Sequence, residues 1–214
     1  MKRILILILV LFNIFSFSQS NISVGFKGGI TLPNVSYENH LKDVTIEISN
    51  NLGFNGGIFA DILKAGQFVL STELYFNQSI VNIKASRVFP QVTNNIDYKA
   101  EFLVYGLFSK YYFTKSIIKP YIFAGPNLSF YIDHRPTSSS YAIPEASLIQ
   151  ITDNINKVVF SIALGAGLDF KTSKKTSIFV ESQFAPGVIN TYKSDDVSAK
   201  TNAVEIKTGF KINL

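Results

Sequence analysis

Hydrophobic and polar side chains alternate along most of the chain. In the clearest stretch, 158–170, Phe160 and Ile162 fall on one side of an extended backbone, while Ser161 and Asp169 fall on the other. A period of two residues is typical of a β-strand whose two faces meet different surroundings. Eight stretches of this kind define the strands that we expect: 22–32, 52–62, 68–77, 101–113, 121–132, 158–170, 178–184 and 204–214.

The connections between these stretches alternate strictly between short and long. The short connections are 63–66, 114–119 and 171–176. The long connections are 33–51, 78–98, 133–157 and 187–200. Short periplasmic turns and longer outside loops are typical of outer-membrane barrels, whereas a soluble sandwich has no reason to gather its long loops at one end. We therefore expect an all-β fold, an eight-stranded antiparallel up-and-down transmembrane β-barrel.

Composition and elementary physics both favour a closed barrel in lipid. Hydrophobic residues make up 47% of the chain and charged residues only 16%, where about 25% charged is usual for soluble domains. No apolar run beyond the N-terminus is long enough for a membrane helix. An open sheet edge in lipid would leave backbone N–H and C=O groups without partners, so only a closed sheet is stable there.

The first twenty residues differ from the rest of the chain. Lys2 and Arg3 precede an apolar run from Ile4 to Phe17, and Ser18 and Ser20 each offer a small residue before a cleavage site. The pattern predicts a cleaved signal peptide at 1–20 and a barrel domain at 21–214. A retained membrane anchor is the alternative, but its apolar core is shorter than the ~20 residues that a spanning helix needs.

Charge and cysteine content exclude several classes of protein. The net charge is +5 and falls to +3 once Lys2 and Arg3 are removed, which is too small and scattered for nucleic acid binding. The chain contains no cysteine, so disulfides and thiolate metal sites are excluded, and we expect no cofactor and no metal. The short connections carry six lysines, which suit anionic phospholipid headgroups or simply keep the turns soluble: Lys64, Lys115, Lys119, Lys171, Lys174 and Lys175.

Six charged residues fall on the polar face of their strands and form the one constellation that we single out: Lys27, Glu73, Glu181, Glu205, Lys207 and Lys211. An eight-stranded barrel is just wide enough for side chains to fill its interior. Buried charges must pair there or cost several kcal/mol each. We expect the three glutamates to pair with the three lysines as a structural plug. A narrow ion or solute path is the alternative. The faces of 101–113, which is rich in aromatic residues, stay unassigned.

Several short motifs resemble the PorT-like outer-membrane barrel family of Bacteroidetes. They are Gly25-Phe-Lys-Gly-Gly29, Glu73-Leu-Tyr75, Lys110-Tyr-Tyr-Phe113, Pro120-Tyr121, Gly125-Pro126 and Gly165-Ala-Gly-Leu-Asp-Phe170. Their order and spacing cover the whole mature chain. The chain departs from the family at Val104 and Gly106, where a Glu and a Pro are common, and at Gln183-Phe184, where Arg-Tyr is common. The resemblance implies an eight-stranded outer-membrane barrel, and some relatives are linked to protein secretion and gliding.

The expected outside loops hold the remaining candidate chemistry. Asp133-His134 with Ser138 to Ser140 is the one acid–base–nucleophile set that can be drawn, and Asp153 with Asp195-Asp196 is the one set of hard-cation ligands. Residues so close in sequence are usually only solvated. Aromatic and cationic side chains that would suit a binding surface are also present: Tyr37, His40, Phe89, Arg135, Tyr141 and Tyr192.

These patterns predict a non-enzymatic, monomeric outer-membrane barrel with a structural or interaction role. Its partners would be outer-membrane lipid and a protein bound at the outside loops or in an envelope or secretion assembly. The alternative is an exported lipocalin-like barrel, which carries a small apolar ligand and has its apolar residues inside. An outer-membrane hydrolase would depend on His134.

Overall fold

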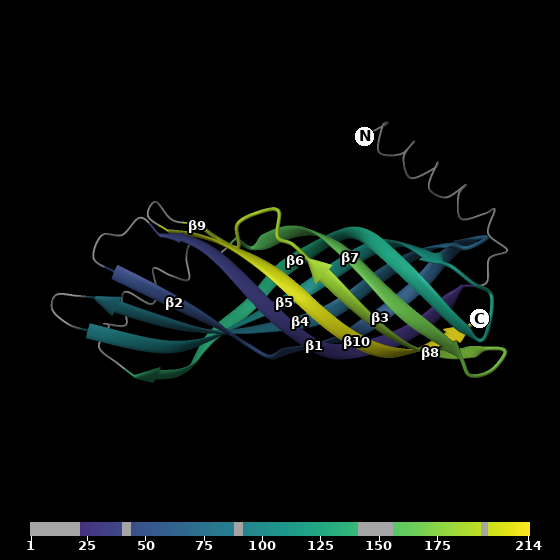
Figure 1. The fold of residues 1–214 in the computed structure, drawn as a ribbon, viewed down its shortest axis with the longest axis horizontal. Coiled ribbons are helices and arrows are strands. Elements are labelled where there is room, and N and C mark those ends of the chain that lie inside the picture. The colour runs from purple at the N-terminus through teal and green to yellow at the C-terminus, as the bar shows by residue number, and fades with distance from the viewer. Residues whose placement is uncertain (1–21, 40–43, 88–91, 141–155, 194–196) are drawn as a thin grey trace, which may run out of the picture.

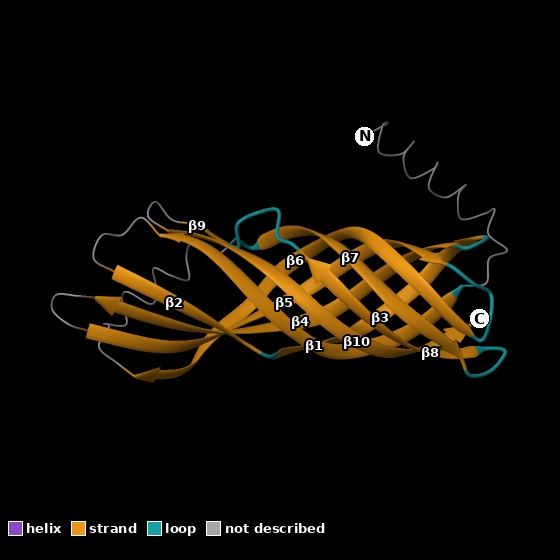
Figure 2. Cartoon of the chain, viewed as in Figure 1, coloured by secondary structure: helices purple, strands orange, loops and turns teal. Residues whose placement is uncertain are grey.

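The computed structural model describes residues 22–39, 44–87, 92–140, 156–193 and 197–214. The expected signal peptide lies outside this part of the chain. Every regular element in these residues is a strand (Figure 2). They contain no helix that is long and apolar enough to cross a membrane. The strands are β1 (Ser23–Asn39), β2 (Val44–Asn51), β3 (Gly53–Ala65), β4 (Phe68–Arg87), β5 (Val92–Tyr112), β6 (Ile118–Ser140), β7 (Val158–Lys171), β8 (Thr176–Ala185), β9 (Tyr192–Lys193) and β10 (Val197–Asn213).

Eight of these strands close into an antiparallel barrel. Hydrogen-bonded neighbours follow the order β1-β3-β4-β5-β6-β7-β8-β10, and β10 pairs back onto β1 from Ser23↔Asn213 to Asn39↔Val197. The backbone N–H of Leu214 also donates to the carbonyl oxygen of Ile22 at 2.9 Å. The predicted eight-stranded antiparallel barrel is therefore confirmed. The two remaining strands lie outside the closed ring, with β2 on β4 and β9 on β10.

The three short turns lie together at one end of the barrel, beside residue 214 (Figure 1). The β3–β4 turn contains Gly66 at φ 66°, a left-handed conformation that glycine adopts without steric cost. In the β7–β8 turn the backbone N–H groups of Thr172 and Ser173 donate to the carbonyl oxygen of Thr176 at 3.0 and 3.1 Å. We call this the short-turn end and the opposite end the long-connection end.

Within the described residues, strands extend into all four long connections, which corrects the expectation that these parts are loops. The β4–β5 ladder continues to Arg87↔Val92, and β2 pairs with β4 from Val44↔Arg87 to Asn51↔Ile80. β1 follows β10 as far as Asn39, whereas its ladder to β3 ends at Thr31↔Gly53. The sequence of β2 also has a period of two, with Val44, Ile46 and Ile48 alternating with Thr45, Glu47 and Ser49. Sequence analysis did not use this signal.

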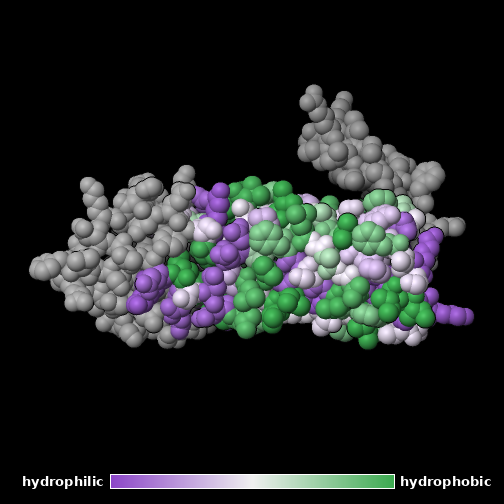
Figure 3. Space-filling model, viewed as in Figure 1, coloured by the Kyte–Doolittle hydropathy of each residue, from purple (hydrophilic) through white to green (hydrophobic). Residues whose placement is uncertain are grey.

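Outward-facing side chains on the eight strands are mainly large and apolar, and inward-facing ones are mainly polar. Phe26 is 62% exposed, Ile58 63% and Leu164 53%, while their neighbours Lys27 and Ala163 are buried. Figure 3 shows the resulting hydrophobic belt, with hydrophilic surface toward the long-connection end. The face assignments of seven strands are confirmed. A lipocalin-like barrel requires the inverse arrangement, so that alternative is wrong.

The fourth strand, whose faces the sequence left unassigned, also alternates in the structure. Phe102, Val104 and Phe108 of β5 point into the barrel and are buried, whereas Leu103 and Tyr105 are exposed. Both faces therefore carry large apolar residues, which hides the period of two. The same register turns Lys110 inward, where it is 3% exposed.

Candidate functional site

The lumen contains one polar network to which each of the eight barrel strands contributes one side chain. Its members, which we call the central network, are Lys27 (β1), Asp61 (β3), Glu73 (β4), Lys110 (β5), Tyr121 (β6), Asp169 (β7), Glu181 (β8) and Lys211 (β10). All eight residues are buried. Inward alternation on each strand, together with the stagger of neighbouring strands, brings these residues from positions far apart in sequence into contact inside the lumen.

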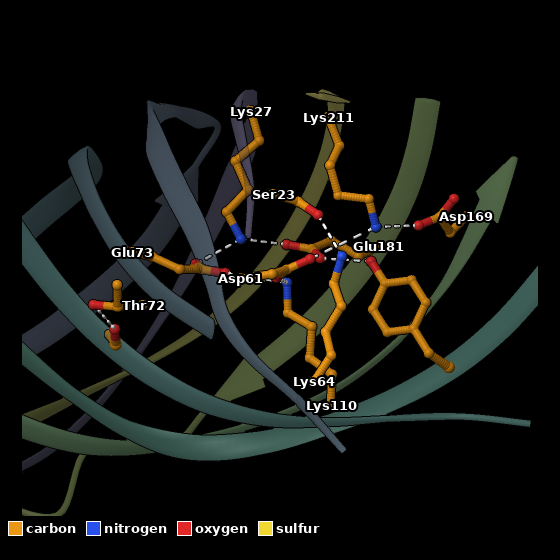
Figure 4. Close-up of polar contacts among 12 residues, drawn as sticks. Ser23, Lys27, Asp61, Lys64, Thr72, Glu73, Lys110, Asp169, Glu181 and Lys211 are labelled. Carbon is orange, nitrogen blue, oxygen red and sulfur yellow. Dashed lines mark hydrogen bonds and ion pairs between the residues drawn. The ribbon is translucent and has the colours of Figure 1, made fainter. Parts of the chain in front are cut away.

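Lys27 joins opposite walls of the barrel. Its Nζ lies 2.6 Å from Glu73 Oε2 on β4 and 2.5 Å from Glu181 Oε1 on β8. The hydroxyl of Tyr121 donates to the second oxygen of Glu181 at 2.8 Å. Figure 4 shows Lys27 pointing between the two glutamates. These contacts span the lumen, and the side chains of Lys27, Glu73 and Glu181 are 1–2% exposed.

Lys110 and Lys211 extend the network toward the short-turn end. Lys110 Nζ lies 3.6 Å from Asp61 Oδ1 and 3.8 Å from Glu73 Oε1. Lys211 Nζ lies 3.7 Å from Asp61 Oδ2 and is also hydrogen-bonded to Asp169 (Figure 4). The expected pairing of Lys211 with a glutamate is therefore wrong, because the stagger places the two aspartates nearer to it.

Glu205 and Lys207 form a second network, closer to the long-connection end. Their charged groups lie 2.5 Å apart, and Gln183 Nε2 donates to Glu205 Oε2 at 3.1 Å. Asn77 Nδ2 donates to the other oxygen of Glu205 at 3.3 Å. The ammonium group of Lys207 lies 3.9 Å from the ring centroid of Tyr75, close enough for a cation–π interaction.

Aromatic rings fill the space around the charges. Phe59 and Phe179 meet edge-to-face with centroids 5.3 Å apart, and the Lys110 ammonium group lies 5.1 Å from the Phe59 centroid. Gly167 faces the ring of Tyr121, where an added Cβ would lie 2.5 Å from Cζ. The absence of a side chain at Gly167 thus makes room for the ring that holds Glu181.

The arrangement is close to charge balance and its members are buried. The buried charged residues comprise five carboxylates and four ammonium groups, and Lys64 lies partly buried beside them. Desolvated ions are tolerated only when paired and hydrogen-bonded in this way. The sequence pattern placed Asp169 on the polar face of its strand but not in the charge cluster, and Asp61 and Lys110 were not singled out.

The other candidate residues gain no support as a catalytic or metal site. Within the described ranges no group of three or more His, Cys, Asp or Glu side chains could hold a metal ion. The segment 134–140 belongs to β6 rather than to a loop, which corrects that expectation. The side chains of His134, Arg135 and the serines after them lie outside what the structure describes. So do those of Tyr37, His40, Phe89, Tyr141, Asp153, Asp195 and Asp196.

Comparison with known proteins places this fold in a family. The sequence profile of the outer membrane protein beta-barrel domain matches residues 17–193, and the chain therefore belongs to that family. It is an outer-membrane β-barrel protein. No curated protein sequence matches the chain.

Solved structures of bacterial outer-membrane proteins share the fold at low sequence identity. Outer membrane protein OprG from Pseudomonas aeruginosa is 14% identical with a TM-score of 0.54, and the match covers 91% of this chain and 96% of OprG. Neisserial surface protein A is 14% identical with a TM-score of 0.51, over 91% of this chain and 98% of that one. The outer membrane protease OmpT from Escherichia coli is 10% identical with a TM-score of 0.52, over 92% and 98%.

Proposed function

We propose that this protein is a non-conducting, non-enzymatic outer-membrane barrel that acts as a scaffold for interaction. The observation that carries the proposal is the central network, in which buried, paired charges from seven strands and a tyrosine hydroxyl from the eighth fill the lumen. A conducting barrel needs solvated charges along an open path. Here the charged groups of Lys27, Glu73 and Glu181 are 1–2% exposed.

The interacting surface in this proposal is the strand extension at the long-connection end, which we place outside the cell. β2 presents Glu47, Ser49, Asn50 and Asn51 to solvent, and Lys84 of β4 is exposed beside them. Such a polar sheet held above the membrane is suited to contact a protein partner. Within the family we assign the chain to the PorT-like branch, on Gly25 to Gly29 and Gly165 to Phe170, and infer a role in an envelope or secretion assembly.

Planar bilayer recordings test the sealed lumen. The unmodified protein, reconstituted at single-molecule density, should give no steady conductance at moderate voltage. Stable open channels would overturn the proposal. The variant Lys27→Ala serves as a positive control for the recording, because removal of the side chain that crosses the lumen should permit transient openings.

Labelling of intact cells tests the sidedness. An epitope tag inserted at Ser139 should be reached by antibody in unbroken cells, whereas a tag at Lys174 should be reached only after the outer membrane is permeabilised. The reason is that β6 extends toward the long-connection end, whereas Lys174 lies in the β7–β8 turn. Equal labelling of both tags in unbroken cells would contradict the proposed topology.

A further inference from the structure

A cavity of about 340 Å³ opens into the lumen at the short-turn end, below the central network. Its wall contains hydroxyl and amide groups from Thr114, Ser177 and Asn213, and its inner part is formed by Asp61 and Asp169. Six lysines also line it: Lys64, Lys115, Lys119, Lys171, Lys174 and Lys211. We call this cavity the lysine vestibule.

Strand register shows that several of these lysines belong to the lumen rather than to the lipid face. Lys119 lies opposite Asp169 and Lys171 lies opposite Ser177, and both partners are buried inside the barrel. Directly opposed residues of an antiparallel pair share one face of the sheet. Ile118, next to Lys119, is 51% exposed on the outer face. The position of these lysines on the lumen side therefore fits the binding of a water-soluble ligand in the barrel mouth better than it fits contact with lipid headgroups.

The carboxylates of the vestibule are already paired. Asp169 is bonded to Lys211, and Asp61 lies within 3.6–3.7 Å of Lys110 and Lys211. Among the described residues Lys64 donates to two neutral oxygens, Ser23 Oγ at 2.6 Å and Asn213 Oδ1 at 3.3 Å. Over the described ranges no carboxylate lies within 4.0 Å of the ammonium groups of the lysines in this set: Lys64, Lys115, Lys119, Lys171 and Lys174.

The three short turns that surround the vestibule contain no Asp or Glu residue between 62 and 67, 113 and 120, or 171 and 176. The turns around the mouth thus carry positive charge without carboxylates, and the carboxylates that line the cavity, Asp61 and Asp169, lie at its inner end and are already paired with lysines. A concave site lined by charges of one sign, with low-dielectric walls, focuses the field and concentrates counter-ions. Its volume is at the lower end of the range of small-ligand pockets.

We propose that the lysine vestibule binds a compact, phosphate-bearing anion. Lysine ammonium groups bind phosphate as point charges, and the hydroxyl of Ser177 supplies a neutral donor beside them. The binding is independent of which side of the membrane this end faces. With the topology proposed above, the ligand comes from the periplasm.

Calorimetric titration of the folded protein in a nonionic detergent with inorganic pyrophosphate tests this site. We expect saturable binding that weakens as salt is added. The double variant Lys119→Gln/Lys171→Gln should bind about tenfold or more weakly, because each lost charged hydrogen bond contributes substantially. The matched control is Lys157→Gln/Lys200→Gln, which removes two exposed lysines distant from the vestibule and should bind like the unmodified protein.

Absence of saturable binding, or equal weakening by both double variants, would overturn the proposal. A shift in gel migration on heating, measured for every variant, shows that each barrel is folded before it is titrated. Titration in phosphatidylcholine vesicles with and without phosphatidylglycerol then separates two sources of phosphate. If the glycerophospholipid displaces pyrophosphate, the natural ligand is a lipid headgroup; if pyrophosphate binding persists, the ligand is soluble.

Discussion

The ion pairs of the lumen and those of the strand extension are formed by the same types of side chain, lysine and glutamate, but the former are buried and the latter are exposed to solvent. Lys27 and Glu73 lie 2.6 Å apart with side chains 2% and 1% exposed, whereas Lys84 and Glu47 lie 3.3 Å apart with side chains 47% and 64% exposed. Solvent supplies a partner to either member of the exposed pair if the other is removed. In the lumen only the protein can do so. The position of a pair in the barrel, rather than its chemistry, therefore decides whether it matters for stability.

The largest effect should follow removal of the ammonium group that joins opposite walls. Lys27→Met leaves Glu73 and Glu181 buried without their shortest partner, and breaking a buried pair typically costs about 3–5 kcal/mol. Urea unfolding in detergent or lipid, followed by gel migration, measures the loss. Adding Glu181→Gln removes one charge of each sign and should restore part of it. A loss as small as that of an exposed pair, about 1 kcal/mol or less, would contradict the central network.

The second-largest loss of stability should follow the placement of a charge on the outward face of the barrel. Leu164 of β7 is 53% exposed on the hydrophobic belt, and a charge at the midplane costs about 2–4 kcal/mol. Leu164→Arg should therefore destabilise the barrel in phosphatidylcholine vesicles in urea titration. Leu164→Ala is the control, since it keeps the site apolar. If both variants unfold at the same urea concentration, Leu164 does not face lipid.

A smaller loss of stability is expected when a side chain is added at a glycine whose space is occupied by an aromatic ring. A methyl group at Gly167 would meet the Tyr121 ring at 2.5 Å and push its hydroxyl away from Glu181, and overpacking typically costs about 1–3 kcal/mol. Gly56→Ala is the matched control, because an added Cβ there has one ordinary contact, at 3.7 Å from the Lys27 carbonyl oxygen. Gly167→Ala should unfold at lower urea than Gly56→Ala, and the reverse order would contradict this packing.

The smallest effect should come from the exposed pair itself. Lys84→Ala and Glu47→Ala should each change stability by about 0–1 kcal/mol, because solvent screens both groups. A double-mutant cycle measured by urea unfolding gives the coupling between them. A coupling comparable to that of Lys27 with Glu181 would mean that the strand extension is shielded from solvent and would remove the contrast drawn above.

The barrel itself could be predicted from the sequence because the two faces of its strands meet lipid and a packed interior. The alternation of the apolar residues Phe160, Ile162 and Leu164 with small or polar residues follows directly from that difference. The strand extensions show a period of two as well, as at Val44, Ile46 and Ile48, but only over short stretches flanked by polar residues. Glu47, Ser49 and Lys84 are solvated polar residues, and such residues are also typical of loops.

The partners inside the lumen could be predicted only in part. Alternation tells which residues point inward, and it placed Lys27, Glu73 and Glu181 correctly. It does not give the stagger between strands, which decides that Lys211 lies beside Asp61 and Asp169. Lys110 was missed because aromatic residues on both faces of β5 erase the period of two.

The contribution of one residue from every strand to the central network has a consequence for how the protein assembles. Lys27 lies on the first strand of the ring and Lys211 on the last, so both reach all their partners only after β10 has paired with β1. A sheet of seven strands, or a ring closed one residue out of register, would present unpaired charges to the membrane interior. The charges of the network are therefore fully paired only in the complete barrel with its correct register, and an incomplete or misregistered sheet lacks the stabilisation that this pairing supplies.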